Sequence, residues 1–253
     1  MLHDIAVVWR GYGTQILGGI GNTMLISIIG TLAGLLIGLF NGVIRTIPTP
    51  KNGFLRFVMK IVNALISVYV EVFRGTPMMV QAMIIYWGYA YANGGKTLDL
   101  LLSGIVIVSI NTGAYITEIV RGGIISIDKG QFEGAASIGM NHFQTMFHVV
   151  LPQVIRNILP SVSNEFVVNI KDTSVLNVIG VTELFFYAAS AAKNTLKLFA
   201  SYLIACAIYF VLTFTVTRLL RLLEKLLAGK DHYTVFGSQS SSAAEIHVVK
   251  EGE

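Results

Sequence analysis

Residues 11–44 read GYGTQILGGIGNTMLISIIGTLAGLLIGLFNGVI and contain no charged side chain in 34 consecutive positions. A helix needs about 20 predominantly apolar residues to cross a hydrocarbon core about 30 Å thick. The apolar core of a secretory signal is shorter, about 7–15 residues, and follows a basic segment, whereas Arg10 is the only Lys or Arg before this run. The run therefore predicts a permanent membrane-spanning helix.

The composition of the whole chain also indicates a membrane protein. Charged residues make up 13% of the 253 residues and hydrophobic residues 54%, against about 25% charged residues in an average soluble protein. Six of the 32 charged residues lie after Ala228, so the preceding chain carries too few charges to cover a water-exposed surface. We predict an all-α integral membrane domain over 1–228 and a polar, Ser-rich cytoplasmic tail over 229–253.

Further apolar runs predict five spans, at about 14–44, 59–92, 98–121, 153–175 and 197–222. The second is ambiguous, because Pro77 either kinks one helix or separates two spans. Lys and Arg gather on the cytoplasmic side of membrane proteins. One kinked helix places eleven Lys and Arg residues on one side and four on the other, whereas two spans would divide the basic clusters. We therefore predict one kinked helix, with the N-terminus outside and the C-terminus in the cytoplasm.

The first span carries a glycine every fourth residue, at Gly30, Gly34, Gly38 and Gly42. Residues four apart lie on one face of a helix. Small residues in this spacing let two membrane helices approach closely. The pattern predicts a packing face, either within the subunit or against a partner.

No enzymatic or metal-binding motif is recognisable. Residues 95–97 (Gly-Lys-Thr) resemble the end of a phosphate-binding loop, but the required first glycine is replaced by Ala90. His142 and His148 are six positions apart, a spacing that suits no metal pair on a helix or strand. The single cysteine, Cys206, excludes a disulfide framework and a cysteine metal cluster. We predict no catalytic residue, metal or cofactor, and the net charge of +4 is explained by cytoplasmic loops rather than nucleic-acid binding.

Polar residues at membrane depth form three stripes, each on one helix face. A charge in the bilayer core costs about 2.5–3.5 kcal/mol on insertion scales, so such residues face a partner or a water-filled path. The stripes comprise Glu71 and Arg74 beside Gly75-Thr76-Pro77; Asn111, Tyr115 and Glu118; and Glu165, Asn169 and Asp172 with adjacent Lys171.

Two interpretations of these stripes are open. The charges could hold helices together, Glu71 with Arg74 and Lys171 with Asp172 or Glu165. Together the stripes could instead line a hydrated cavity with acidic and basic groups, as a zwitterionic amino acid requires. Broken helices such as the one predicted at Pro77 hold polar solutes in transporters.

The loop over residues 128–152, on the predicted cytoplasmic side, has the features of a docking helix. Small residues at 134–137 permit close approach of another protein surface. Gly139 can end one helix, and the amphipathic run that follows can start another.

At this loop the sequence resembles the permease subunits of bacterial ATP-binding-cassette importers. Their signature is Glu-Ala-Ala, three residues, Gly, nine residues, then an aliphatic, any residue and Leu-Pro. Here it reads Glu133-Gly134-Ala135, then Gly139 and residues 149–152 (Val-Val-Leu-Pro), with glycine for the first alanine. Residues 71–77 (EVFRGTP) and 164–174 (NEFVVNIKDTS) are similar to the polar amino acid (histidine/glutamine-type) subfamily. The resemblance covers about 10–225.

The resemblance implies a five-helix permease of the type I importer architecture in the bacterial cytoplasmic membrane. It implies a second permease copy, identical or homologous, two cytoplasmic ATP-binding subunits and an extracytoplasmic substrate-binding protein. ATP hydrolysis by the partners would drive alternating access and import of polar or charged L-amino acids. An ion-coupled secondary transporter, an inactive scaffold subunit, and a permease for another small solute such as an osmolyte or a peptide fragment are the alternatives.

The resemblance and the stripes together define the expected site residues. For substrate they are Glu71, Arg74, Gly75, Thr76, Pro77, Asn111, Tyr115, Glu118, Glu165, Asp172, Thr173 and Ser174. We expect Arg74, Gly75 and Thr76 to bind the substrate carboxylate. For coupling to the ATPase they are Glu133, Gly134, Ala135 and Gly139.

Overall fold

The computed structural model describes residues 1–228, which form helices joined by short loops and contain no strand. The predicted tail, 229–253, lies outside the described residues. In chain order the elements are α1 (Leu2–Ile44), α2 (Gly53–Gly75), α3 (Met78–Ala92), α4 (Leu100–Ile125), α5 (Lys129–Ser137), α6 (His142–Thr145), the π-helical η1 (Met146–Val150), α7 (Leu151–Asp172), the 3₁₀-helical η2 (Thr173–Ile179), α8 (Leu184–Thr195) and α9 (Leu198–Ala228).

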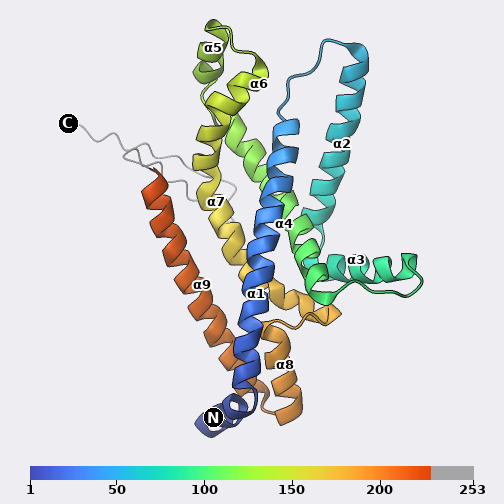
Figure 1. Cartoon of the computed structure of the whole chain (residues 1–253), viewed down its shortest axis with the longest axis vertical. Coiled ribbons are helices and arrows are strands. Elements are labelled where there is room, and N and C mark those ends of the chain that lie inside the picture. Colours follow the sequence, from blue (N-terminus) through green and yellow to red (C-terminus); the bar gives the residue numbers. More distant parts are fainter. Residues whose placement is uncertain (229–253) are drawn as a thin grey trace, which may run out of the picture.

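Four helices are long and apolar enough to cross a membrane: α1, α2, α4 and α9. A fifth candidate crossing is the pair His142–Ile179 and Leu184–Thr195, whose two parts are long and apolar enough only when taken together and meet at a bend of 52°. Figure 1 shows the long helices side by side, with α5 and α6 at one end and α8 at the other. The all-helical membrane fold is confirmed, and α8 is an additional helix between the predicted fourth and fifth spans.

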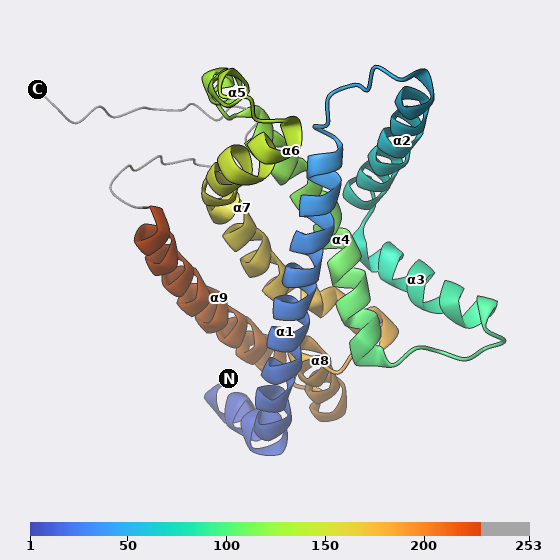
Figure 2. The ribbon, with the colours of Figure 1, turned by 45° about the horizontal axis from the view of Figure 1, so that its top comes forward.

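The most extensive helix packing joins α1 to α4 (Figure 2). A Cβ atom built on any of the four spaced glycines of α1 would lie within 3.0 Å of an α4 side chain. The contacted residues also recur every fourth position: Val108, Thr112, Ile116 and Val120. The order of the four contacts shows that α1 and α4 run parallel. The glycine face therefore packs within the subunit.

Pro77 separates two helices and does not merely bend one. The first, α2, ends at Gly75, and its 23 residues reach about 34 Å at 1.5 Å per residue. That length crosses the hydrocarbon core without α3. Figure 1 shows α3 running crosswise to α2 and outward from the bundle, starting at the end of α2. The prediction of a single kinked helix over 59–92 is therefore wrong, because proline removes the amide needed to continue the helix.

The first helix is longer than the predicted span, since it begins at Leu2. Its N-terminal part is tied to the junction between α8 and α9 by two contacts. Asp4 forms an ion pair with Lys197 at 2.6 Å, and Asn194 donates a hydrogen bond to the Tyr12 hydroxyl at 2.8 Å. These contacts extend the helix before the predicted start at residue 14.

Candidate translocation and coupling sites

The first two polar stripes meet where α2 ends against α4. The guanidinium of Arg74 lies over the Tyr115 ring, 5.4 Å from its centroid, a favourable cation–π arrangement. Glu71 and Arg74 are both exposed, and in the described chain they form no ion pair with each other. The α2 end therefore presents an acidic and a basic group, one of them already oriented by an aromatic ring.

Polar side chains at the helix break have partners. The Thr76 hydroxyl donates to the Val72 carbonyl at 2.7 Å. Asn111, 8% exposed on α4, donates to the Gln81 side chain at 2.9 Å. Gly75 and Pro77 are exposed, and a Cβ at Gly75 would meet nothing within 4 Å. The predicted residues 71–77 and 111–115 are thus brought together, while Gln81 was missed by the sequence analysis.

Glu118 lies further along α4, toward its C-terminal end. Its carboxylate accepts hydrogen bonds from Arg121 at 3.0 and 2.8 Å. The other oxygen forms an ion pair with Arg45 at the end of α1, and Arg45 also reaches the Ser67 hydroxyl on α2 at 3.4 Å. This arrangement favours the interpretation of Glu118 as a tie between helices.

The third stripe lies on α7 and faces the core. Asn169, 3% exposed, accepts from Thr112 at 3.1 Å and donates to Thr31 at 2.8 Å, which joins α7 to α4 and α1. Glu165 is 7% exposed, and Asp172 is half-buried.

The residues after Asp172 continue this stripe. Thr173 is buried and donates to the Ile170 carbonyl at 3.0 Å, whereas Ser174 is half-buried. The contacts of α7 described above thus run to α1 and α4, and not to the Arg74 face of α2.

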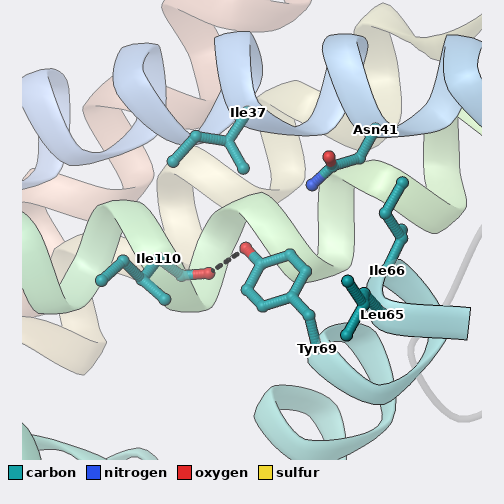
Figure 3. A pocket seen from close by; sticks show the side chains of 6 residues that line it. All are labelled: Ile37, Asn41, Leu65, Ile66, Tyr69 and Ile110. Atoms are coloured by element: carbon teal, nitrogen blue, oxygen red, sulfur yellow. Dashed lines mark hydrogen bonds between the residues drawn. The ribbon is translucent and has the colours of Figure 1, made fainter. Parts of the chain in front are cut away.

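A cavity of about 320 Å³ between α1, α2 and α4 is almost wholly apolar. Figure 3 shows its lining: Ile37, Asn41, Leu65, Ile66, Tyr69 and Ile110. The Tyr69 hydroxyl donates to the Ile110 carbonyl at 2.6 Å, so its polar tip is satisfied. The cavity lacks the opposite charges that a zwitterion requires, and the candidate substrate groups lie outside it.

The coupling loop has the helix–turn–helix form that the sequence predicts. Asp128 caps α5 by accepting from Gly130. Gly139 adopts φ +81°, a left-handed conformation that suits glycine, and Asn141 with Gln144 forms a capping box at the start of α6. The end of the first helix at Gly139 is confirmed.

The predicted coupling residues lie on α5 and its turn. Glu133, Gly134 and Gly139 are exposed, whereas Ala135 is 5% exposed and anchors the helix. A Cβ at Gly134 would meet nothing within 4 Å. The loop therefore offers an open, small-residue surface at one end of the molecule.

Residues 53–229 match the family described as binding-protein-dependent transport system inner membrane component. The chain belongs to this family. It is 33% identical over 225 residues to the glutamine transport system permease protein GlnP of Escherichia coli (strain K12), covering 89% of this chain and 98% of that protein. It is 36% identical over 222 residues to the L-cystine transport system permease protein TcyB of Bacillus subtilis (strain 168), covering 87% and 90%.

Solved structures agree with this assignment. A chain of the crystal structure of an amino acid ABC transporter with histidines matches with a TM-score of 0.73 and 34% identity, covering 87% of this chain and 97% of that one. The MetNI methionine ABC transporter matches in fold, with a TM-score of 0.63 at 17% identity over 82% and 95%. The permease is thus a multi-pass transport subunit and not an enzyme. Its family implies ATP-binding subunits and a substrate-binding protein.

The permease contains one buried carboxylate that the sequence analysis missed. Glu183 is 0% exposed and caps α8 by accepting from the Phe185 and Phe186 amides at 2.9 and 2.7 Å. The Tyr209 hydroxyl of α9 donates to it at 2.7 Å, and Thr23 of α1 reaches it at 3.4 Å. The sequence signal that could have identified Glu183 is its place as a single acidic residue in an otherwise uncharged stretch. Among residues 1–228, no three His, Cys, Asp or Glu side chains lie close enough together to bind a metal ion.

Proposed function

We propose that this permease imports polar or charged L-amino acids across the bacterial cytoplasmic membrane by alternating access. ATP hydrolysis in two cytoplasmic partner subunits drives the change, and a second permease copy, identical or homologous, completes the pathway. The observation that carries the proposal is that α2 exposes an acidic and a basic group one helical turn apart, Glu71 and Arg74, with Arg74 held over Tyr115. The names of the relatives, which include glutamine and cystine permeases, support an amino acid substrate.

The carboxylate of the substrate would lie between Arg74 and the start of α3. The first N–H groups of a helix have no acceptor within the helix, and an anion is stabilised near them. In α3 the first intrahelical bond from the backbone is donated by Val80 to the Pro77 carbonyl at 3.0 Å. The backbone amides of Met78 and Met79 therefore come before the first helical hydrogen bond of α3 and lie close in sequence to Gly75 and Thr76.

The ammonium group of the substrate requires a carboxylate acceptor. Glu71 is one turn from Arg74 and exposed, which makes it our first choice. Asp172 and Glu165 on α7 are the further acidic groups, and the half-buried Ser174 is a hydroxyl ligand beside Asp172. Thr173 is buried and donates to the Ile170 carbonyl, so it supports this region from behind. Glu118 is proposed as a tie between α1 and α4, because two arginines occupy its carboxylate.

The orientation proposed for the permease places α5 and α6 in the cytoplasm and the N-terminus outside. Figure 1 shows that the C-terminal ends of α1 and α4 and the start of α2 lie toward the α5 end of the molecule. These segments carry Arg45, Arg121, Lys51, Arg56 and Lys60. A concentration of Lys and Arg near one end is expected on the cytoplasmic side.

The first test is ATP hydrolysis by the complete complex in nanodiscs, with its binding protein, across a panel of L-glutamine, L-cystine, L-histidine and L-methionine. We expect stimulation by polar amino acids. Glu71→Ala and Asp172→Ala should each reduce that stimulation about tenfold or more, because each removes a charged partner of a desolvated substrate. Glu224→Ala, on α9, is the matched control. A complex that no panel member stimulates, or variants that respond like the control, would count against the proposal.

A second test concerns the docking surface. Gly134→Trp adds bulk to an exposed position of α5 where a Cβ meets nothing within 4 Å, so the permease should fold normally. Because an ATPase surface must approach this helix closely, we expect recovery of the ATP-binding subunits by affinity purification to fall about tenfold. Gly11→Trp, equally unobstructed on α1, should leave recovery unchanged. Equal recovery with both variants would place the docking surface elsewhere.

A further inference from the structure

One side chain bonds the carbonyl groups that the helix break leaves without donors. Pro77 has no N–H, so the Phe73 carbonyl four residues earlier has lost its helical partner. The Gln81 amide nitrogen donates to this carbonyl at 2.9 Å and to the Thr76 carbonyl at 2.9 Å. It also lies 2.8 Å from the Thr76 hydroxyl. Gln81, on α3, therefore replaces the missing backbone donor from the far side of the break.

The same amide joins the break to α4. Its oxygen accepts from Asn111 at 2.9 Å, and the Asn111 nitrogen also lies 3.4 Å from the Phe73 carbonyl. Gln81 and Asn111 are 6% and 8% exposed, so the network is shielded from water. A hydrogen bond is more costly to lose in such a buried environment than in water. Asn111 is one helical turn from Tyr115, which holds Arg74. The end of α2, the start of α3 and the middle of α4 are thus tied beside the proposed carboxylate site.

We propose that Gln81 is a positioning residue for substrate recognition. It holds α3 across the end of α2, and so sets the first amides of α3 at the angle to Arg74 that the substrate carboxylate requires. Gln81 acts through the groups it orients and does not touch the substrate. This inference rests on the proposed function of the permease, since it assigns a role in the same site.

The test separates substrate recognition from folding by comparing basal and stimulated ATP hydrolysis. The complete complex with its binding protein is placed in nanodiscs, and the amino acid panel named above is titrated. Gln81→Leu removes the amide but keeps the bulk. We expect its basal hydrolysis to stay within about twofold of wild type, while the half-saturating amino acid concentration rises about tenfold or more, as misplaced binding groups predict. Gln15→Leu, exposed on α1, is the matched control and should change neither value.

A second variant, with a backbone donor restored at position 77, distinguishes a loss of substrate recognition from a folding defect. In Pro77→Ala/Gln81→Leu the alanine supplies a backbone N–H that bonds the Phe73 carbonyl once the extended residues 76–77 become helical. The melting temperature should therefore lie within a few degrees of wild type. Stimulation by amino acids should stay reduced, because the α3 angle is no longer held. Recovery of stimulation together with melting temperature would overturn the inference, as would parallel losses of basal and stimulated hydrolysis in Gln81→Leu. A wild-type complex that no panel member stimulates would instead reject the proposed function itself.

Discussion

Gly38→Leu is expected to destabilise the folded permease by about 3 kcal/mol. A Cβ atom at this position would lie 2.6 Å from the Ile116 Cβ and 2.9 Å from its backbone carbonyl carbon. Overpacking of this kind costs about 1–3 kcal/mol or more, and here the α4 backbone itself stands in the way. At about 3 kcal/mol, a protein of this size loses about 6–12 °C in melting temperature. Thermal melting and size-exclusion recovery of the purified permease measure the effect.

The matched control lies on the same helix. Gly21→Leu introduces the same side chain where nothing lies within 4 Å of the added Cβ. It should melt close to wild type, because helix propensity favours leucine over glycine by about 0.5–1 kcal/mol. Similar melting of the two variants would contradict the close packing of α1 on α4.

Glu183→Ala is expected to have the second largest effect on stability. The substitution removes the α8 cap, which contributes about 1 kcal/mol. It also leaves the partly buried Tyr209 hydroxyl without its acceptor, at about 1–3 kcal/mol. We therefore expect a loss of about 2–4 kcal/mol. The α1 helix also packs directly against the backbone of Glu183, since a Cβ at Gly19 would lie 2.8 Å from the Glu183 carbonyl carbon. Side chains of α1 therefore have no room to fill the space that Glu183→Ala leaves. Thermal melting of the variant provides the measurement.

Asp99→Ala separates the capping contribution from the buried contact. Asp99 caps α4 by accepting from the Leu102 amide at 2.9 Å, but it is exposed. Its replacement should cost about 1 kcal/mol, clearly less than Glu183→Ala. If the two variants lose equal stability, the Tyr209 contact contributes nothing and our account of Glu183 fails.

Helix faces were predictable because they depend on spacing along one segment. The row from Gly30 to Gly42 indicated a close-packed face from its period of four, and the structure packs that face against α4. The turn at Gly139 was predictable for a similar reason, since glycine readily adopts the left-handed conformation that ends a helix. In both cases one short stretch contains all the information.

The helix break was only half predictable. Pro77 indicated an interruption of the helix, but a proline alone does not decide whether the helix bends slightly or ends, with a second helix running crosswise to it. That outcome depends on contacts with residues distant in the sequence, such as the Asn111 bond to Gln81 on α3. The sequence therefore favoured a kinked helix where the structure has two helices.

The sequence by itself determined the class of protein, the polar helix faces and the turn at Gly139, since composition and periodicity are local properties of the chain. Only the tertiary structure decided which polar groups meet. It paired Glu118 with Arg45, seventy-three positions away, and joined Asn169 to Thr31 across 138 positions. The physical reason is that periodicity orients a side chain around its own helix, whereas its partner depends on the register in which separate helices pack.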